Sequence, residues 1–309
     1  MSATPRTAVR QGLEEPMPMT MPRLAKKKRL GEPIVMVTAY DYPSAQVAQA
    51  AGVDLVLVGD SGAMTVLGYS STVPVSTDEM LMLASAVRRG LTAPLLIGDL
   101  PFGSYEASDE LAIATAQRFV KEAGCDAVKI ERGGTSIQRA RAIVEAGIPV
   151  MGHVGLTPQT AIALGGHRAQ GRTADRALGV ARDALALQEA GCFSVVFEAI
   201  PAAVATMVTE MLEVPVIGIG AGPGTDGQVL VFHDLLGIFD DFIPPFVKRY
   251  ADVKADMIAG VAQYADEVRH RLFPAPEHSY SIDDEELRRF QDKLRDGGET
   301  ARWPRPSGT

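Results

Sequence analysis

Four short apolar segments of this 309-residue chain end on a carboxylate, and a fifth ends on a histidine. The carboxylates are Asp60, Asp99, Glu131 and Glu198, and the histidine is His153. Short runs rich in Val, Ile and Leu are typical of parallel strands that are buried on both faces. A charged group at the end of such a strand must leave the core. We therefore expect these five side chains to gather at one edge of a sheet.

Asp60, Asp99 and Glu131 end three successive predicted strands. Carboxylate oxygens on neighbouring strand ends suit Mg²⁺, which binds one or two carboxylates together with water and substrate oxygens. Lys129 lies two residues before Glu131, so both side chains point to the same face of a strand. A buried lysine needs an anionic partner, and a substrate carboxylate would serve. The alternative is that each acid caps a loop or pairs with an arginine.

Glu198 ends a later predicted strand and lies between Phe197 and Ala199. Apolar surroundings raise the pKa of a carboxyl group, which allows it to act as a general base near neutral pH. We predict that Glu198 is the catalytic base, with a structural ion pair as the alternative. The position of His153 among acids favours contact with substrate, although a core histidine with two hydrogen bonds is also possible.

One pattern recurs along the chain: a helix-like segment ends on Ala-Gly, and a strand begins two residues later. Its glycines are Gly52, Gly124, Gly147 and Gly191. Glycine ends helices because it adopts the left-handed conformation without strain, and such short connections are typical of parallel sheets. The predicted strands are 34–40, 55–60, 94–99, 127–131, 149–153, 194–198, 215–220 and 242–247. The predicted helix starts are Ser76 or Thr77, Ser108 and Thr173.

Eight parallel strands with helices between them predict a (β/α)8 TIM barrel, whose chemistry lies at the C-terminal strand ends. The alternative is an open doubly wound sheet, but no Gly-x-Gly-x-x-Gly motif follows the first strand.

We expect residues 31–273 to form the barrel domain and residues 1–30 an N-terminal arm. Residues 274–309 are predicted to be a partly disordered tail with a helix at 283–295. The glycine-rich loop 218–224 predicts either phosphate binding or tight packing.

The composition excludes several functional classes. A net charge of −8 and an isoelectric point near 5.2 argue against binding to nucleic acid or to an anionic membrane. No apolar stretch approaches the ~20 residues of a membrane span. Cys125 and Cys192 have no neighbouring cysteine, so we expect both to be buried and free, as in a reducing cytoplasm.

Ten motifs, in order over roughly residues 22–280, resemble the ketopantoate hydroxymethyltransferase family. They are Val37-Thr-Ala-Tyr-Asp-Tyr42, Leu57-Val-Gly-Asp-Ser61, Asp99-Leu-Pro-Phe102, Val128-Lys-Ile-Glu131, Gly152-His-Val-Gly-Leu-Thr-Pro-Gln159, Gln170-Gly-Arg172, Ile217-Gly-Ile-Gly-Ala-Gly222, Asp226-Gly-Gln-Val-Leu230, Phe246-Val-Lys-Arg-Tyr250 and Glu277-His-Ser279. The resemblance implies a barrel of the phosphoenolpyruvate mutase and isocitrate lyase superfamily. It also implies a cytoplasmic homo-oligomer, commonly a decamer built as a pentamer of dimers.

The resemblance further implies Mg²⁺-dependent transfer of a hydroxymethyl group from 5,10-methylenetetrahydrofolate to 3-methyl-2-oxobutanoate, giving 2-dehydropantoate for pantothenate synthesis. Asp60, Asp99 and Glu131 would hold Mg²⁺. Ser61 and Lys129 would contact the 2-oxo acid together with Asp60 and Asp99. Glu198 would be the base.

The chain departs from the family pattern at Arg132, which precedes Gly133-Gly134, and at the segment Gly62-Ala-Met64. Two other functions are weighed against the transferase. One is a carbon–carbon lyase or mutase of the same superfamily that acts on another 2-oxo acid. The other is a non-catalytic assembly paralogue, against which the intact acids argue, because idle buried carboxylates are costly.

Overall fold

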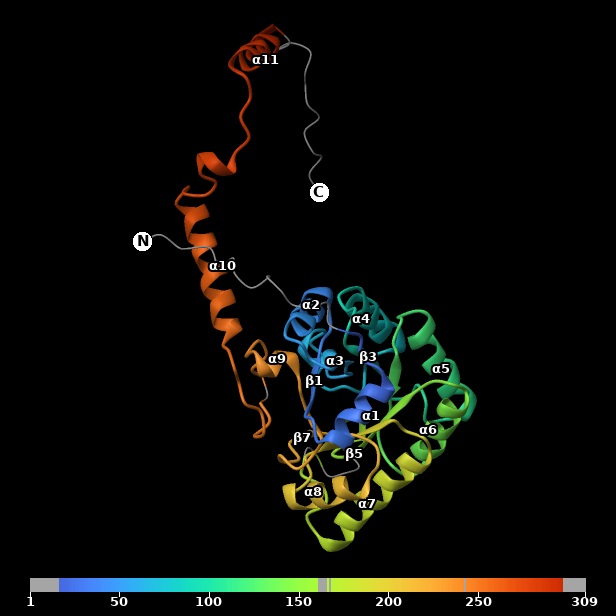
Figure 1. Cartoon of the computed structure of the whole chain (residues 1–309). Helices are drawn as coiled ribbons and strands as arrows, with labels where there is room; N and C mark the ends of the chain where they lie inside the picture. The colour runs from blue at the N-terminus through green and yellow to red at the C-terminus, as the bar shows by residue number, and fades with distance from the viewer. Residues whose placement is uncertain (1–16, 161–165, 167, 242, 297–309) are drawn as a thin grey trace. The chain divides into compact units, whose positions relative to one another are not determined.

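The computed structural model describes residues 17–160, 166, 168–241 and 243–296. Eight parallel strands pair in sequence order and close into a barrel, which confirms the predicted fold and excludes the open sheet (Figure 1). The strands are β1 Ile34–Thr38, β2 Leu55–Val58, β3 Leu95–Asp99, β4 Ala127–Lys129, β5 Val150–Gly155, β6 Ser194–Glu198, β7 Val216–Ile219 and β8 Gly227–Leu230.

Helices surround the strands on the outside of the barrel (Figure 1). They are α1 Met21–Leu30, α2 Tyr42–Ala50, α3 Gly62–Thr65, α4 Thr77–Arg89, α5 Asp109–Lys121, α6 Thr135–Glu145, α7 Ala174–Glu189, α8 Ala202–Met211 and α9 Phe232–Leu235, with a 3-10 turn at Pro158–Thr160. The side chains of Ser76, Ser108 and Thr173 each accept a backbone N–H of the first helical turn, so these predicted helix starts are confirmed. The four predicted helix-ending glycines all have positive φ, between 70° and 93°.

The eighth strand was predicted at 242–247, and that prediction is wrong. The strand is β8, which pairs with β7 and closes the barrel on β1. Residues 220–226 alone connect β7 to β8, with no helix between them. The repeated pattern of a helix, Ala-Gly and a strand is therefore absent between β7 and β8. For this reason the pattern does not predict β8.

The glycine-rich connection from β7 to β8 packs closely on its neighbours. A β-carbon at Gly222 would collide with Ala202, and one at Gly224 would collide with Thr206. Gly220 lies directly under the ring of Phe246. These contacts support the packing alternative for the loop, and phosphate binding stays a prediction.

Alternate residues of each strand point into the barrel and form its inner core. These inner residues include Ile97 of β3, Ala127 of β4, Met151 of β5 and Val196 of β6. The next inward position lies two residues further along each strand. Those positions hold, in the same order, Asp99, Lys129, His153 and Glu198. The strand period therefore aims four polar side chains into the barrel just above its apolar core.

Helix α1 covers the opposite end of the barrel. Its Leu24 is 1% exposed and belongs to the inner core. Lys27 pairs with Asp54 at 2.6 Å, and Lys28 pairs with Asp226 at 2.7 Å. Asp54 and Asp226 directly precede β2 and β8, so these ion pairs fix α1 at the N-terminal strand ends. Residues 21–30 of the predicted arm thus form a helix on the barrel, and residues 1–16 lie outside the described residues.

The chain divides into two compact units, Met1–Asp252 and Val253–Thr309. The described part of the second unit contains α10 Val253–Arg269, a 3-10 turn at Pro276–His278 and α11 Asp284–Asp296. Helix α11 confirms the predicted helix at 283–295. The predicted domain boundary at residue 273 stays a prediction, and the disorder predicted for the last residues falls outside the described residues. None of the described helices is long and apolar enough to cross a membrane.

Arg132→Gly is expected to stabilise the protein by about 0.5–1 kcal/mol. Arg132 is exposed and has a φ of 80°, and a side chain in the left-handed region costs about 1–2 kcal/mol. Glycine removes that cost but loses part of the gain through its larger entropy in the unfolded chain. Urea unfolding measures the change. Arg141→Gly, at an exposed position inside α6, should destabilise instead, and destabilisation by both variants would contradict the argument.

Candidate active site

The first structural feature of the site is a cluster of three buried carboxylates. Asp60, Asp99 and Glu131 are 4%, 1% and 1% exposed. Each offers a carboxylate oxygen, and these oxygens lie within 4.8 Å of one another. The backbone N–H of Asp60 donates to Asp99 Oδ2 at 3.1 Å, which holds two of the acids in place. The three strand-end acids are therefore brought together as the sequence predicted.

Lys129 is the cation of this cluster. Its Nζ lies 2.7 Å from Asp99 Oδ1 and 3.4 Å from Glu131 Oε1. Asp99 and Lys129 are register partners in the β3–β4 ladder, which places their side chains next to each other. An ammonium group has three donors, so one N–H remains beyond these two carboxylates for an anionic ligand.

The charges of the cluster are unbalanced. Burial, together with the charges of Asp99 and Glu131, raises the pKa of Asp60 well above its usual value. Burial also raises the pKa of Asp99, although Lys129 opposes this. Three carboxylates facing one lysine leave negative charge uncompensated, and a divalent cation would compensate it. The hard oxygen donors therefore fit Mg²⁺.

His153 links the cluster to Glu198. Its Nδ1 lies 3.2 Å from Glu131 Oε1. Its Nε2 lies 3.3 Å from Glu198 Oε2, in an ion-pair contact that is not aligned as a hydrogen bond. The Glu198 side chain is 15% exposed, so it meets both a polar ring and solvent rather than only the apolar neighbours expected from the sequence.

Histidine and glutamate shift one another's pKa values in this chain of contacts. Burial alone would lower the pKa of His153, but Glu131 and Glu198 raise it to about 9. Burial alone would raise the pKa of Glu131, but Lys129 and His153 lower it to about 2. His153 is therefore a cation at neutral pH and Glu131 an anion.

The contribution of His153 to stability is expected to decrease at alkaline pH. The pKa of His153 is raised from about 6.5 to about 9 on folding, so protonated His153 stabilises the folded state. This stabilisation is fully present below pH 6.5 and is lost as the pH rises through 9. Unfolding of chelator-treated protein at pH 6.5 and pH 9 measures this. The stability difference between wild type and His153→Asn should shrink by about 1–3 kcal/mol across this range. A difference that stays constant between pH 6.5 and pH 9 would refute the argument.

Gln159 and Tyr105 belong to the site but were not among its predicted residues. Gln159 Nε2 donates to Asp60 Oδ2 at 3.1 Å, and its backbone N–H donates to Glu131 Oε2 at 3.2 Å. The Tyr105 hydroxyl donates to Gln159 Oε1 at 2.7 Å and accepts the N–H of Glu131 at 3.2 Å. This network fixes the orientation of two carboxylates of the cluster. The only sequence signal was the Thr-Pro-Gln159 motif.

All seven predicted site residues line one cavity of about 390 Å³ at the C-terminal strand ends. They are Asp60, Ser61, Asp99, Lys129, Glu131, His153 and Glu198. Ser61 Oγ lies 2.8 Å from the Tyr40 hydroxyl, which orients it. Met64 also lines the cavity, whereas Arg132 does not, so of the two departures from the family pattern only the 62–64 segment reaches the site. The volume is within the range of small-molecule sites, ~300–1,000 Å³.

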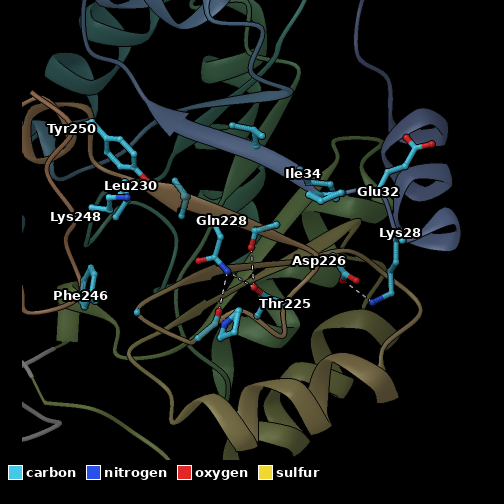
Figure 2. Close-up of a pocket in the computed structure, with 18 residues that line it drawn as sticks. Lys28, Glu32, Ile34, Thr225, Asp226, Gln228, Leu230, Phe246, Lys248 and Tyr250 are labelled. Carbon is cyan, nitrogen blue, oxygen red and sulfur yellow. Dashed lines mark hydrogen bonds and ion pairs between the residues drawn. The ribbon is translucent and has the colours of Figure 1, made fainter.

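A larger cavity of about 980 Å³ lies outside the barrel along β8 (Figure 2). It exists because no helix covers this strand between β7 and β8. Most of its charged groups already have partners: Lys28 pairs with Asp226, and Lys248 lies 4.7 Å from the Tyr250 ring centre. The amide of Gln228 is held by Thr225 and by the carbonyl of Gly222. Without converging titratable groups, this cavity lacks the chemistry of the smaller one.

Both cysteines are buried and free, as predicted. Burial raises the pKa of Cys125 and of Cys192 to about 12. Neither lines the cavity, so neither thiol is placed to react there.

The family model of ketopantoate hydroxymethyltransferase matches residues 18–276. The chain belongs to the ketopantoate hydroxymethyltransferase family. A 3-methyl-2-oxobutanoate hydroxymethyltransferase from Moorella thermoacetica is 55% identical over 262 residues, which cover 85% of this chain and 97% of that protein. The Arabidopsis thaliana protein named 3-methyl-2-oxobutanoate hydroxymethyltransferase 1, mitochondrial, is 50% identical over 304 residues, or 95% of this chain and 88% of that one.

Membership of the ketopantoate hydroxymethyltransferase family makes the chain an enzyme of hydroxymethyl transfer, which excludes the non-catalytic paralogue.

Solved structures share the fold at low identity. Phosphonopyruvate hydrolase in complex with oxalate and Mg²⁺ has a TM-score of 0.55 at 13% identity and covers 92% of this chain and 99% of its own. A 2,3-dimethylmalate lyase of the phosphoenolpyruvate mutase and isocitrate lyase superfamily has a TM-score of 0.53 at 16% identity, covering 93% and 100%. These likenesses confirm the predicted barrel fold, and membership of the predicted superfamily stays a prediction.

Proposed function

We propose that this ketopantoate hydroxymethyltransferase converts 3-methyl-2-oxobutanoate, 5,10-methylenetetrahydrofolate and water into 2-dehydropantoate and tetrahydrofolate, with Mg²⁺ bound by Asp60, Asp99 and Glu131. One observation carries the proposal. A buried metal-binding carboxylate cluster, a lysine and a fourth carboxylate, Glu198, line the same cavity.

The division of roles follows from the geometry. Lys129 has a free N–H beside the cluster and pairs with the carboxylate of the 2-oxo acid. Glu198 removes the C3 proton, and its contact with His153 holds it in position. Mg²⁺, when bound, polarises the keto group and stabilises the negative charge that develops on its oxygen. Gln159 and Tyr105 keep the carboxylates in their orientation.

Two assays test the proposal on the purified protein. NMR should detect exchange of the C3 proton of 3-methyl-2-oxobutanoate in deuterated water without folate, and formation of 2-dehydropantoate once 5,10-methylenetetrahydrofolate is added. Both reactions should stop with chelator and return with Mg²⁺. Activity that persists after chelation, or a preference for another 2-oxo acid in a substrate panel, would contradict the proposal. Cleavage of a carbon–carbon bond in that panel would favour the lyase alternative.

We also propose a cytoplasmic homo-oligomer, a decamer built as a pentamer of dimers. The free buried cysteines agree with a reducing compartment. The oligomer rests on the resemblance to the family, and light scattering coupled to gel filtration measures it directly.

A further inference from the structure

The active-site cavity contains a third aspartate, which the mechanism does not use. Asp234, from the short helix α9, is 8% exposed and lines the same cavity as the carboxylate cluster. Among the described residues no hydrogen-bond donor reaches its carboxylate, and Arg249 acts on it only through charge. Burial raises the pKa of Asp234 to about 6. Its oxygens are not enclosed by protein, so the carboxylate is open to the cavity, where a ligand with N–H donors can reach it.

A second polar group in this cavity also lacks a partner. Thr72 is 4% exposed, and its Oγ1 is fully buried without a hydrogen bond to any described residue. It lines the cavity together with Asp234. Because the Thr72 oxygen is closed off by protein, Asp234 is the group that a polar ligand edge can reach.

The lining of the cavity is largely apolar and includes two aromatic rings. Phe239 and Phe246 line the cavity, together with Pro244 and Val247. The Phe246 ring lies directly against Gly220, where even a β-carbon would collide with it, so the ring is held in place. Aromatic rings pack well against flat heterocycles. The lining of the cavity thus combines aromatic and apolar side chains with a carboxylate.

The charge of Asp234 decides between the two substrates. The 2-oxo acid is an anion that can pair with Lys129, whereas the carboxylate of Asp234 would only repel it. The pteridine ring of a folate is flat, and its 2-amino-4-oxopyrimidine edge presents an N3–H and an amino N–H side by side. A carboxylate accepts such a pair of donors through its two oxygens, as it does from a guanidinium group.

We propose that Asp234 anchors the pteridine ring of the folate co-substrate, with the ring packed against the side chains of Phe239 and Phe246 that line the same cavity. This inference rests on the proposed function, since it assigns the site of its one-carbon donor. It divides the cavity into a carboxylate and lysine end for the 2-oxo acid and an Asp234 end for the folate.

The test compares two ligands on two proteins. Tetrahydrofolate and its 2-desamino-2-methyl analogue, which lacks the donor amino group, are titrated calorimetrically against wild type and Asp234→Asn. Wild type should bind the analogue about 10- to 100-fold more weakly, the range expected when a hydrogen bond to a charged group is lost. Asp234→Asn should bind tetrahydrofolate more weakly by a similar factor. The variant should then distinguish the two ligands by less than about threefold.

Kinetic measurements separate this role from a structural one. Asp234→Asn should raise the KM for 5,10-methylenetetrahydrofolate by about 10-fold or more and leave the KM for the 2-oxo acid within about twofold. Asp183→Asn, a half-buried acid outside the cavity, is the matched control and should change neither constant. The comparison of the two ligands on wild type needs no variant, so it holds even if Asp234→Asn fails to fold.

Three outcomes would overturn the inference. Wild type that binds tetrahydrofolate and the analogue equally would overturn it alone, provided that the protein still makes 2-dehydropantoate. The inference alone would also be overturned if Asp234→Asn still bound the analogue 10- to 100-fold more weakly than tetrahydrofolate. The two losses of affinity would then be independent, and the amino group would not contact Asp234. Wild type without transfer activity would overturn the proposed function and this inference together.

Discussion

Glu198→Gln is expected to slow exchange of the C3 proton of 3-methyl-2-oxobutanoate by about 10²–10⁴-fold, the usual loss when a general base is removed. Glutamine keeps the shape of the side chain and an oxygen that can face His153 Nε2, which lies 3.3 Å from Glu198 Oε2. Binding of Mg²⁺ and of the 2-oxo acid should therefore be nearly unchanged. NMR in deuterated water without folate measures the exchange rate directly.

The matched control is Glu213→Gln, at an exposed position outside the cavity, which should exchange at the rate of wild type. If Glu198→Gln exchanges the C3 proton as fast as wild type, Glu198 is not the base. His153 would then be tested next, and because its pKa is raised to about 9, exchange that depends on it should increase as the pH rises toward 9.

Asp99→Ala is expected to weaken Mg²⁺ binding by about 100-fold or more and to abolish turnover. Asp99 supplies one of the three clustered oxygens and also fixes its neighbours, since it accepts the N–H of Asp60 and pairs with Lys129. Loss of groups that only support a metal site already costs about 10–100-fold in affinity. The charge of Asp99 also raises the pKa of Asp60, so that pKa should fall in the metal-free variant.

Thermal unfolding with and without Mg²⁺ provides a readout that is independent of activity. Wild type should gain about 2.7 kcal/mol at a Mg²⁺ concentration of 100 times Kd, and Asp99→Ala should gain almost nothing at that concentration. Asp78→Ala, whose side chain is 81% exposed on α4, should keep the full gain. Equal stabilisation of Asp99→Ala and wild type by Mg²⁺ would exclude Asp99 as a ligand.

Local signals in the sequence determined most of the barrel. The helix-ending glycines, the caps at Ser76, Ser108 and Thr173, and seven of the eight strands follow from residue types at fixed short spacings. The two-residue alternation of side chains along each strand also places four polar side chains inside the barrel, and this follows from the sequence alone. They are Asp99, Lys129, His153 and Glu198. These features depend on neighbours within a few residues, so the sequence alone contains them.

The eighth strand shows where local signals end. Gly227–Leu230 is as long as β2, but glycine and glutamine begin it instead of an apolar run, and no helix precedes it. It is a strand because β7 and β1 leave a gap between them that needs one more hydrogen-bonded partner. Closure of the barrel, rather than the propensity of these four residues, decides their structure.

Only the tertiary structure decided which polar side chains meet. Gln159 reaches Asp60 across 99 positions of sequence, Tyr105 reaches Gln159 across 54, and Asp234 reaches the cavity from beyond the last strand. The same closure placed Asp234 in the lining of the cavity, where its carboxylate stays open to a ligand. Hydrogen-bond partners are chosen by distance in space, and no short spacing in the sequence encodes contacts that exist only after eight strands have closed on one another.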